Sequence, residues 1–173
     1  MGRIHLVLYQ PEIPQNTGNI MRTCLATNTK LHLIEPLGFK LGEKEIKRSG
    51  ANYIHEVDYC LYPDFQTFMD KNSAGEHYFL SRYGTHSMYD VDALNPSKDY
   101  YFILGSESTG IPKDILKQYI EKTVRLPMAE KVRALNLSNV AAIIVYEALR
   151  QQGFPNLSFR EPEHLKGSDY LLK

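Results

Sequence analysis

Short apolar runs alternate with helix-like segments along this chain, and that alternation narrows the possible folds more than any single motif. Strands are expected at residues 4–9, 31–35, 77–80, 100–104 and 124–126. Helices are expected at residues 17–27, 44–49, 64–71, 113–119 and 137–152. Parallel strands need crossover connections, which are usually helices. The sequence therefore predicts an α/β fold with a mostly parallel sheet flanked by helices.

The segment at residues 137–152 has the clearest helical period. Its apolar residues recur every three or four positions, at Leu137, Val140, Ala141, Ile144, Val145, Ala148 and Leu149. This spacing gives the helix one buried face. Asn136 or Ser138 is expected to cap its start, and Gly153 to end it.

The composition is that of an ordinary globular protein, with 43% hydrophobic and 23% charged residues among 173. We expect a single domain at residues 1–155 and a peripheral C-terminal tail at residues 156–173. Twenty basic and twenty acidic side chains give a formal net charge of zero. A nucleic-acid partner would therefore have to bind a local basic patch.

The cysteines and histidines lack the spacing of a metal site, so no metal is expected. Cys24, among apolar neighbours on a helix, is expected to be a buried, inert thiol. Apolar runs stay well short of the roughly 18 residues of a membrane helix, and the first residues resemble a strand rather than a signal peptide. A cytoplasmic protein without membrane contact is expected.

A glycine-rich loop, GSESTGIP at residues 105–112, follows the strand expected at residues 100–104. Ligands of parallel sheets bind outside the carboxyl ends of strands, where this loop falls. Gly105 and Gly110 have the glycine spacing of a phosphate-binding loop, but the lysine that should follow is missing. With Glu107 as its one charge, the loop favours a neutral or cationic ligand over ATP or GTP. By itself, the loop is interpreted equally well as a plain turn.

The segment NTGNIMR at residues 16–22 stands at the start of the first expected helix, where Asn16 or Thr17 is the expected cap. If the first turn of this helix faces a ligand, Arg22 binds an anionic group such as a phosphodiester. Taken alone, a surface arginine lying over the helix is the better interpretation.

The segment RLPMAEKVRALNLS at residues 125–138 joins the last expected strand to the last helix. It contains basic and polar side chains at Arg125, Lys131, Arg133, Asn136 and Ser138. By itself it is best interpreted as a loop with a helix cap. A parallel sheet can nevertheless gather all three segments at one edge, because each lies at a strand-to-helix junction.

Together, the three segments resemble the motifs of the SPOUT class of RNA 2′-O-methyltransferases. The matching residues are NTGNIMR at 16–22, FILGSESTGIP at 102–112, LPM at 126–128, RALNLS at 133–138, and Tyr146 with Glu147. The short chain, with LYQPEIPQNTGN at 8–19 and IEPLGF at 34–39, is similar to the branch that methylates the wobble nucleotide of tRNA. That resemblance implies cytidine or modified uridine 34, with leucine tRNAs as the expected substrates.

The resemblance also implies features that no local pattern shows. The C-terminal part of the domain would be threaded into a deep trefoil knot whose loops bind S-adenosylmethionine. The protein would be a homodimer with active sites near the subunit interface. Methyl transfer from a sulfonium mostly needs alignment of donor and acceptor, and no metal.

Carried over to this chain, the resemblance implies cofactor contacts at Leu80, Gly105, Leu126, Ala134 and Leu135. Ala134 departs from the family pattern, which has serine, so only a backbone contact is expected there. Arg22 matches the arginine that helps to activate the ribose hydroxyl, and phosphate binding suits a guanidinium better than proton abstraction. The remaining motif residues would organise the site: Asn16, Asn19, Glu107, Asn136 and Ser138.

Two other functions stay open at this point. One is a knotted RNA-binding or assembly protein without catalysis, and the other is a generic nucleotide-binding domain that takes ATP or NAD. RNA binding is expected to use a basic patch of Arg22, Lys44, Lys47, Arg48, Lys131 and Arg133. Gly105→Val is expected to block the cofactor by projecting a branched side chain into its pocket.

Overall fold

Seven parallel strands form one sheet in the computed structural model, which describes residues 2–42, 55–93, 95 and 97–173. The strands are β1 (Ile4–Tyr9), β2 (Lys30–Ile34), β3 (Tyr59–Tyr62), β4 (Glu76–Leu80), β5 (His86–Ser87), β6 (Tyr100–Leu104) and β7 (Thr123–Arg125). They lie in the order β3-β2-β1-β6-β4-β7-β5, and every neighbouring pair is parallel. The predicted α/β fold with a parallel sheet is confirmed.

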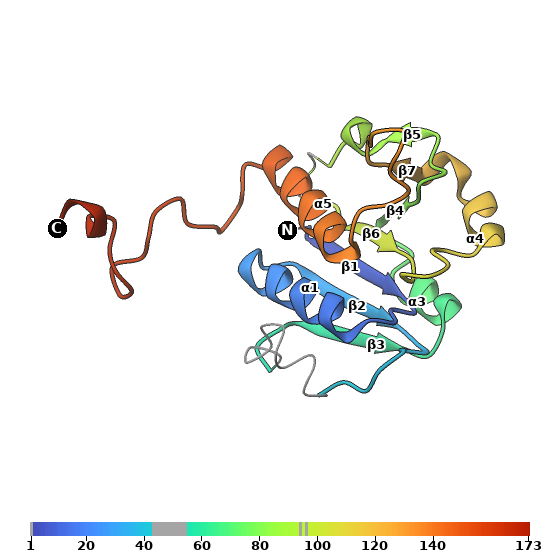
Figure 1. Cartoon of the computed structure of the whole chain (residues 1–173), viewed down its shortest axis with the longest axis horizontal. Coiled ribbons are helices and arrows are strands. Elements are labelled where there is room, and N and C mark those ends of the chain that lie inside the picture. The colour runs from blue at the N-terminus through green and yellow to red at the C-terminus, as the bar shows by residue number, and fades with distance from the viewer. Residues whose placement is uncertain (1, 43–54, 94, 96) are drawn as a thin grey trace.

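Helices cover both faces of this sheet (Figure 1). They are α1 (Pro14–Ala26), α3 (Phe65–Lys71), α4 (Lys113–Gln118) and α5 (Leu137–Gln151), with short 3₁₀ helices at Met88–Asp90, Ile120–Lys122 and Tyr170–Leu172. Helices α1 and α5 pack side by side on one face, and α3 and α4 on the other. Because both faces are covered, the central strands β1 and β6 are apolar at almost every position.

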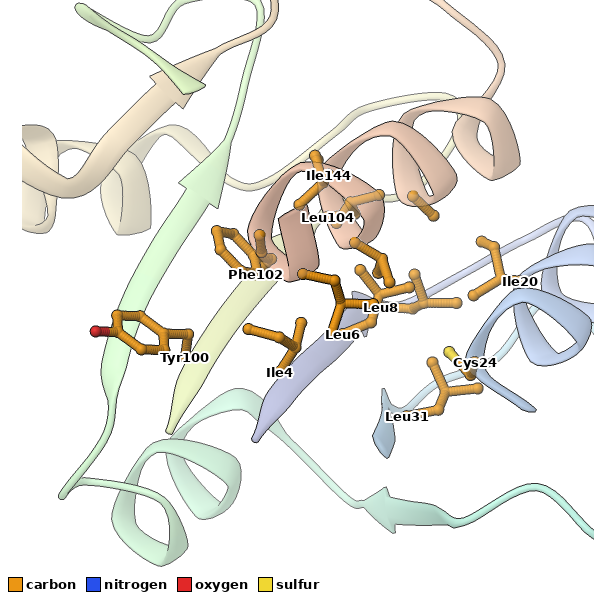
Figure 2. Close-up of a cluster of buried hydrophobic side chains, with 14 of the residues drawn as sticks. Ile4, Leu6, Leu8, Ile20, Cys24, Leu31, Tyr100, Phe102, Leu104 and Ile144 are labelled. Atoms are coloured by element: carbon orange, nitrogen blue, oxygen red, sulfur yellow. The ribbon is translucent and has the colours of Figure 1, made fainter. Parts of the chain in front are cut away.

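The larger core lies between the central strands and helices α1 and α5 (Figure 2). Leu6, Phe102, Ile20 and Ile144 are completely buried there. Burial of each such side chain contributes about 1.5–3 kcal/mol to stability. Cys24 lies in the same core, and its burial raises the pKa of its thiol to about 12, as expected of an inert cysteine.

The predicted bounds agree best where the pattern is strongest. The strand expected at residues 100–104 is β6, and the helix expected at residues 137–152 is α5, capped by Asn136 through the N–H of Ser138. The other expected strands and the helices at residues 64–71 and 113–119 agree within one residue at each end. Strands β3 and β5 were not predicted, because each is short and partly exposed.

The start of α1 differs from the prediction. The helix begins at Pro14, and Ile13 rather than Asn16 or Thr17 occupies its cap position. Proline fits the first turn because its missing N–H has no partner to lose there. Asn16 and Thr17 therefore lie within the first turn of the helix, and their side chains are buried in the fold. The helix expected at residues 44–49 lies outside the described residues.

After α5, Phe154 and Leu157 still pack against the larger core, and the chain beyond them extends away from the domain, as the red end of the ribbon in Figure 1 shows. Large apolar side chains are uncovered along this segment, including Phe159 (80% exposed) and Leu171 (92%). In the part of the chain that the structure describes, no helix is long and apolar enough to cross a membrane. The domain boundary at residue 155 and the knot stay predictions.

A buried cluster of polar side chains, His5, His32 and Tyr62, lies on the face of the sheet that α3 covers, where His32 and Tyr62 contact Phe68. His5 Nδ1 lies 2.9 Å from His32 Nε2, and His32 Nδ1 lies 2.9 Å from the Tyr62 hydroxyl. Desolvation by burial is the main cause that lowers the pKa of His5 to about 4 and the pKa of His32 to about 3. The Asp99 carboxylate, 3.5 Å from His5 Nε2, raises the pKa of His5 but does not outweigh the burial. Both rings are therefore neutral at pH 7.

The stability of the fold should fall as the pH drops from 7 to 5. Both histidines bind protons less readily in the folded state than in the unfolded state, where their pKa is about 6.5. Proton uptake below this pH therefore lowers the free energy of the unfolded state more than that of the folded state. The expected loss is about 2 kcal/mol for each histidine, measured by urea denaturation at several pH values.

The variant His32→Gln, which keeps hydrogen-bonding groups but cannot ionise, should remove about half of this pH dependence, because His5 still contributes the other half. His86→Gln is the matched control, because the His86 side chain is half exposed. A wild-type stability that is constant between pH 7 and 5 would contradict the prediction.

Candidate active site

The three motif segments meet at the carboxyl edge of the sheet. Leu104, the last residue of β6, pairs with Leu8 of β1 on one side and with Leu80 of β4 on the other. The loops that follow β1 and β6 consequently leave neighbouring strands at the same level. The loop after β7 returns to α5, which packs beside α1.

These loops surround a cleft of about 1070 Å³. The five residues predicted to contact a cofactor all line it: Leu80, Gly105, Leu126, Ala134 and Leu135. Leu126 is 7% exposed and forms part of the wall, whereas Leu135 is 39% exposed. Apolar walls with a few polar groups are typical of small-molecule sites.

Two glutamates clamp the loop after β1 to the loop after β6. The Glu107 carboxylate accepts hydrogen bonds from the backbone N–H of Glu12 (2.8 Å) and of Ile13 (3.2 Å). In return, the Glu12 carboxylate accepts from the Ser108 N–H (3.0 Å) and the Ser108 hydroxyl (2.7 Å). Glu107 also stands at the start of α1, where the helix dipole favours a negative charge. The charge of Glu107 is thus used to hold the loops together.

The same network extends to the third segment through two asparagines. Asn16 Nδ2 donates to Glu107 (3.0 Å), and Asn136 Nδ2 donates to Asn16 Oδ1 (3.0 Å). Asn136 Oδ1 in turn accepts from the N–H and hydroxyl of Ser138. A continuous chain of hydrogen bonds therefore joins four of the predicted supporting residues. The fifth, Asn19, lies exposed on α1 outside this chain.

Gly105 is required for a different reason than the one predicted. A Cβ atom at this position would collide with the backbone of Gly110 and Ile111 in the same loop. The loop closes on itself through the Gly110 N–H, which donates to the Ser106 carbonyl (2.9 Å), and Gly110 has a positive φ of 71°. Valine at position 105 would therefore force the loop apart before it reached a ligand.

Arg22 is exposed on α1 and is not among the residues that line the cleft of its own chain. Lys131 and Arg133, two further members of the predicted basic patch, are exposed as well. Lys44, Lys47 and Arg48 lie outside the described residues. The basic patch for RNA stays a prediction.

The turn between β4 and β5 was missed by the sequence analysis. Arg82 and Tyr83 lie in this turn and line the cleft, together with Lys113 and Lys117 of α4. An aromatic residue beside a basic one, directly after an expected strand and before Gly84, was the signal available.

Glu107→Gln should destabilise the protein by about 1–3 kcal/mol, the usual worth of hydrogen bonds to a charged group. The amide keeps the size of the side chain but offers only one acceptor oxygen to the donors on the loop after β1. Urea denaturation measures the change, and the exposed Glu130→Gln is the control. Equal stability of the two variants would show that the clamp contributes little.

Comparisons with known proteins point to one family. The matching family model, described as the SpoU rRNA Methylase family, covers residues 3–146. A Geobacillus stearothermophilus protein with the provisional name tRNA (cytidine(34)-2′-O)-methyltransferase is 50% identical over 155 residues, or 90% of this chain and 99% of that protein. The Escherichia coli K12 protein named tRNA (cytidine(34)-2′-O)-methyltransferase is 37% identical over 161 residues, or 91% of this chain and 99% of that protein.

A solved structure agrees with these relatives. It was described for the 2′-OH methylation of C/U34 on tRNA, is 38% identical in sequence, and superposes with a TM-score of 0.81 over 88% of this chain and 97% of its own. The resemblance of the three motifs to RNA 2′-O-methyltransferases is thereby confirmed, and the chain belongs to the SpoU methylase family.

Proposed function

We propose that this protein transfers a methyl group from S-adenosylmethionine to the ribose 2′-hydroxyl of the wobble nucleotide of a tRNA. The proposed acceptor is cytidine or modified uridine 34, and leucine tRNAs are the proposed substrates. The observation that carries the proposal is the joining of three motif loops around one cleft by the Glu107–Asn16–Asn136 hydrogen bonds. Relatives named for this reaction match the chain over almost their whole length.

The cleft suits S-adenosylmethionine in size and lining. Its apolar wall, with Leu80, Leu104 and Leu126, offers contact to a purine ring. The loop at residues 105–110 also lines the cleft, so its backbone groups can bind the polar atoms of the cofactor. When bound, this cofactor supplies a methyl group already activated by a sulfonium. The protein then has to align the acceptor and exclude water, so no metal is part of the proposal. Glu107 contributes by shaping the loop, since its carboxylate is held by the start of α1.

A homodimer is part of the same proposal. Arg22 lies on the exposed side of α1, outside the cleft of its own chain, which supports a site that two copies share. In that arrangement the Arg22 guanidinium binds the phosphate next to the reacting ribose and holds the 2′-hydroxyl in line. The knotted threading of the C-terminal segment and a cytoplasmic location, where tRNA is modified, complete the proposal.

Transfer of labelled methyl from S-adenosylmethionine to a tRNA pool tests the reaction directly. The wild type should modify nucleotide 34. Arg22→Ala should lose at least about 100-fold in turnover, as expected for a residue that positions the reacting group, and should keep its affinity for the cofactor by calorimetry. Binding of cofactor and tRNA without any transfer would instead support the non-catalytic RNA-binding protein. Binding of ATP or NAD in place of the cofactor would support the generic nucleotide-binding domain.

A mixture of two inactive variants tests whether the site is shared. Ala134→Trp should fill the cleft without disturbing the core, because Ala134 is exposed at its rim. In a symmetric dimer, co-refolding it with Arg22→Ala should restore about a quarter of the wild-type activity. Each mixed dimer then holds one intact cleft facing one intact Arg22. No recovery, with mixed dimers shown to form, would place Arg22 and the cleft in the same copy.

A further inference from the structure

We propose that Tyr83, with Arg82 beside it, is a stacking platform for an unpaired base of the RNA substrate at the mouth of the cleft. The inference rests on the proposed function and names the part of the substrate that the turn between β4 and β5 recognises. It makes Tyr83 a binding residue for RNA rather than for the cofactor.

The first observation is the exposure of the ring. Tyr83 is 69% exposed, although it stands on the lining of the main cleft. The guanidinium carbon of Arg82 lies 4.9 Å from the centre of the Tyr83 ring. An aromatic face next to a guanidinium is the pair of groups on which unstacked bases bind in single-stranded RNA.

The second observation is that the turn is held in place by strand β7. The N–H of Ser81 donates to the carbonyl of Val124 (3.0 Å), and the Arg125 guanidinium donates to the carbonyl of Arg82. Gly84 packs so closely on β7 that an added Cβ would collide with the backbone of Val124. The backbone that carries Tyr83 is therefore fixed before any ligand binds.

The side-chain hydroxyl of Ser81 closes the turn from within by accepting from the N–H of Tyr83 (3.2 Å). The N–H of Gly84 donates to the carbonyl of Ser81 (3.1 Å). A preorganised platform costs little conformational entropy when a base stacks on it. This separates Tyr83 from an aromatic side chain that is exposed merely because it lies on a mobile loop.

The third observation is the charge around the platform. The basic residues on the lining of the cleft are Arg82, Lys113, Lys117 and Arg125. Among the described lining residues, the single acidic side chain is Glu107, whose carboxylate is occupied by the loop after β1. The mouth of the cleft is thus positive in a chain of zero net charge, which suits a phosphodiester backbone entering beside the stacked base.

The test compares Tyr83→Ala with Tyr83→Phe in binding to an anticodon stem-loop RNA. Loss of the ring should raise the Kd for RNA by about tenfold, the usual effect of removing one base-stacking partner. Tyr83→Phe should keep near wild-type affinity because the ring face remains. The control is Tyr89→Ala, since Tyr89 is 53% exposed nearby but does not line the cleft.

The cofactor provides a second readout. Tyr83→Ala should bind S-adenosylmethionine with unchanged affinity and melt at the wild-type temperature, because the turn is held by its backbone. A loss of cofactor affinity with unchanged RNA affinity would overturn the inference and assign the ring to the cofactor. Equal RNA affinity in Tyr83→Ala and the wild type would overturn it as well.

Abasic substitutions in the RNA identify the stacked base. Removing the base that stacks on Tyr83 should weaken binding to the wild type but not to Tyr83→Ala, a coupling that a double-mutant cycle measures. The scan covers nucleotide 34 and the neighbours on each side. Coupling at one position supports the inference, and coupling at none overturns it.

The two proposals fail separately. Methyl transfer by the wild type together with unaltered RNA binding by Tyr83→Ala overturns the stacking platform alone. Absence of transfer by the wild type overturns the proposed reaction, and the RNA affinities of the Tyr83 variants then decide the platform independently.

Discussion

The reciprocal clamp between Glu12 and Glu107 is the interaction on which the candidate active site depends. Each carboxylate accepts from backbone or hydroxyl groups of the other loop, so neither loop can move without breaking charge-assisted hydrogen bonds. Through Asn16 and Asn136 the same network reaches the start of α5. Polar contacts between loops therefore hold the cleft together, and core residues such as Leu104 and Leu126 form part of its wall.

The sheet makes this clamp possible by bringing distant segments to one edge. Strand β1 lies next to β6, although about 90 residues separate them in the chain, and their register aligns Leu8 with Leu104. The loops that follow them therefore start side by side. Helices α1 and α5 pack together on one face and carry Asn16 and Asn136 to the same place.

The sequence was sufficient to predict the bounds of elements whose burial shows in their pattern of apolar residues. β6 is apolar throughout, and α5 has a helical period, so their bounds could be predicted. The predicted start of α1 was wrong. Asn16 and Thr17 are residue types that often cap helices, but the helix begins earlier, at Pro14. Local preference cannot show which of several suitable residues the tertiary structure uses.

The sequence predicted which residues belong to the candidate site, but only part of how they are arranged. All five predicted cofactor residues line one cleft. The sequence shows that Glu107 is charged, but it does not show which groups the carboxylate binds, because its partners Glu12 and Ile13 lie more than 90 residues away in the chain. For the same reason Gly105 was expected to face a ligand, whereas its missing Cβ makes room for the loop's own backbone.

The hydrogen bond from Asn136 to Asn16 also determines when, during synthesis of the chain, the cleft can form. Residues near the start of the chain form the first wall, and Asn136 and Ser138, far along the chain, form the last. In a chain still being synthesised, the cleft cannot close until the segment that carries Asn136 has been made. Binding in the cleft would thus distinguish finished molecules from nascent ones.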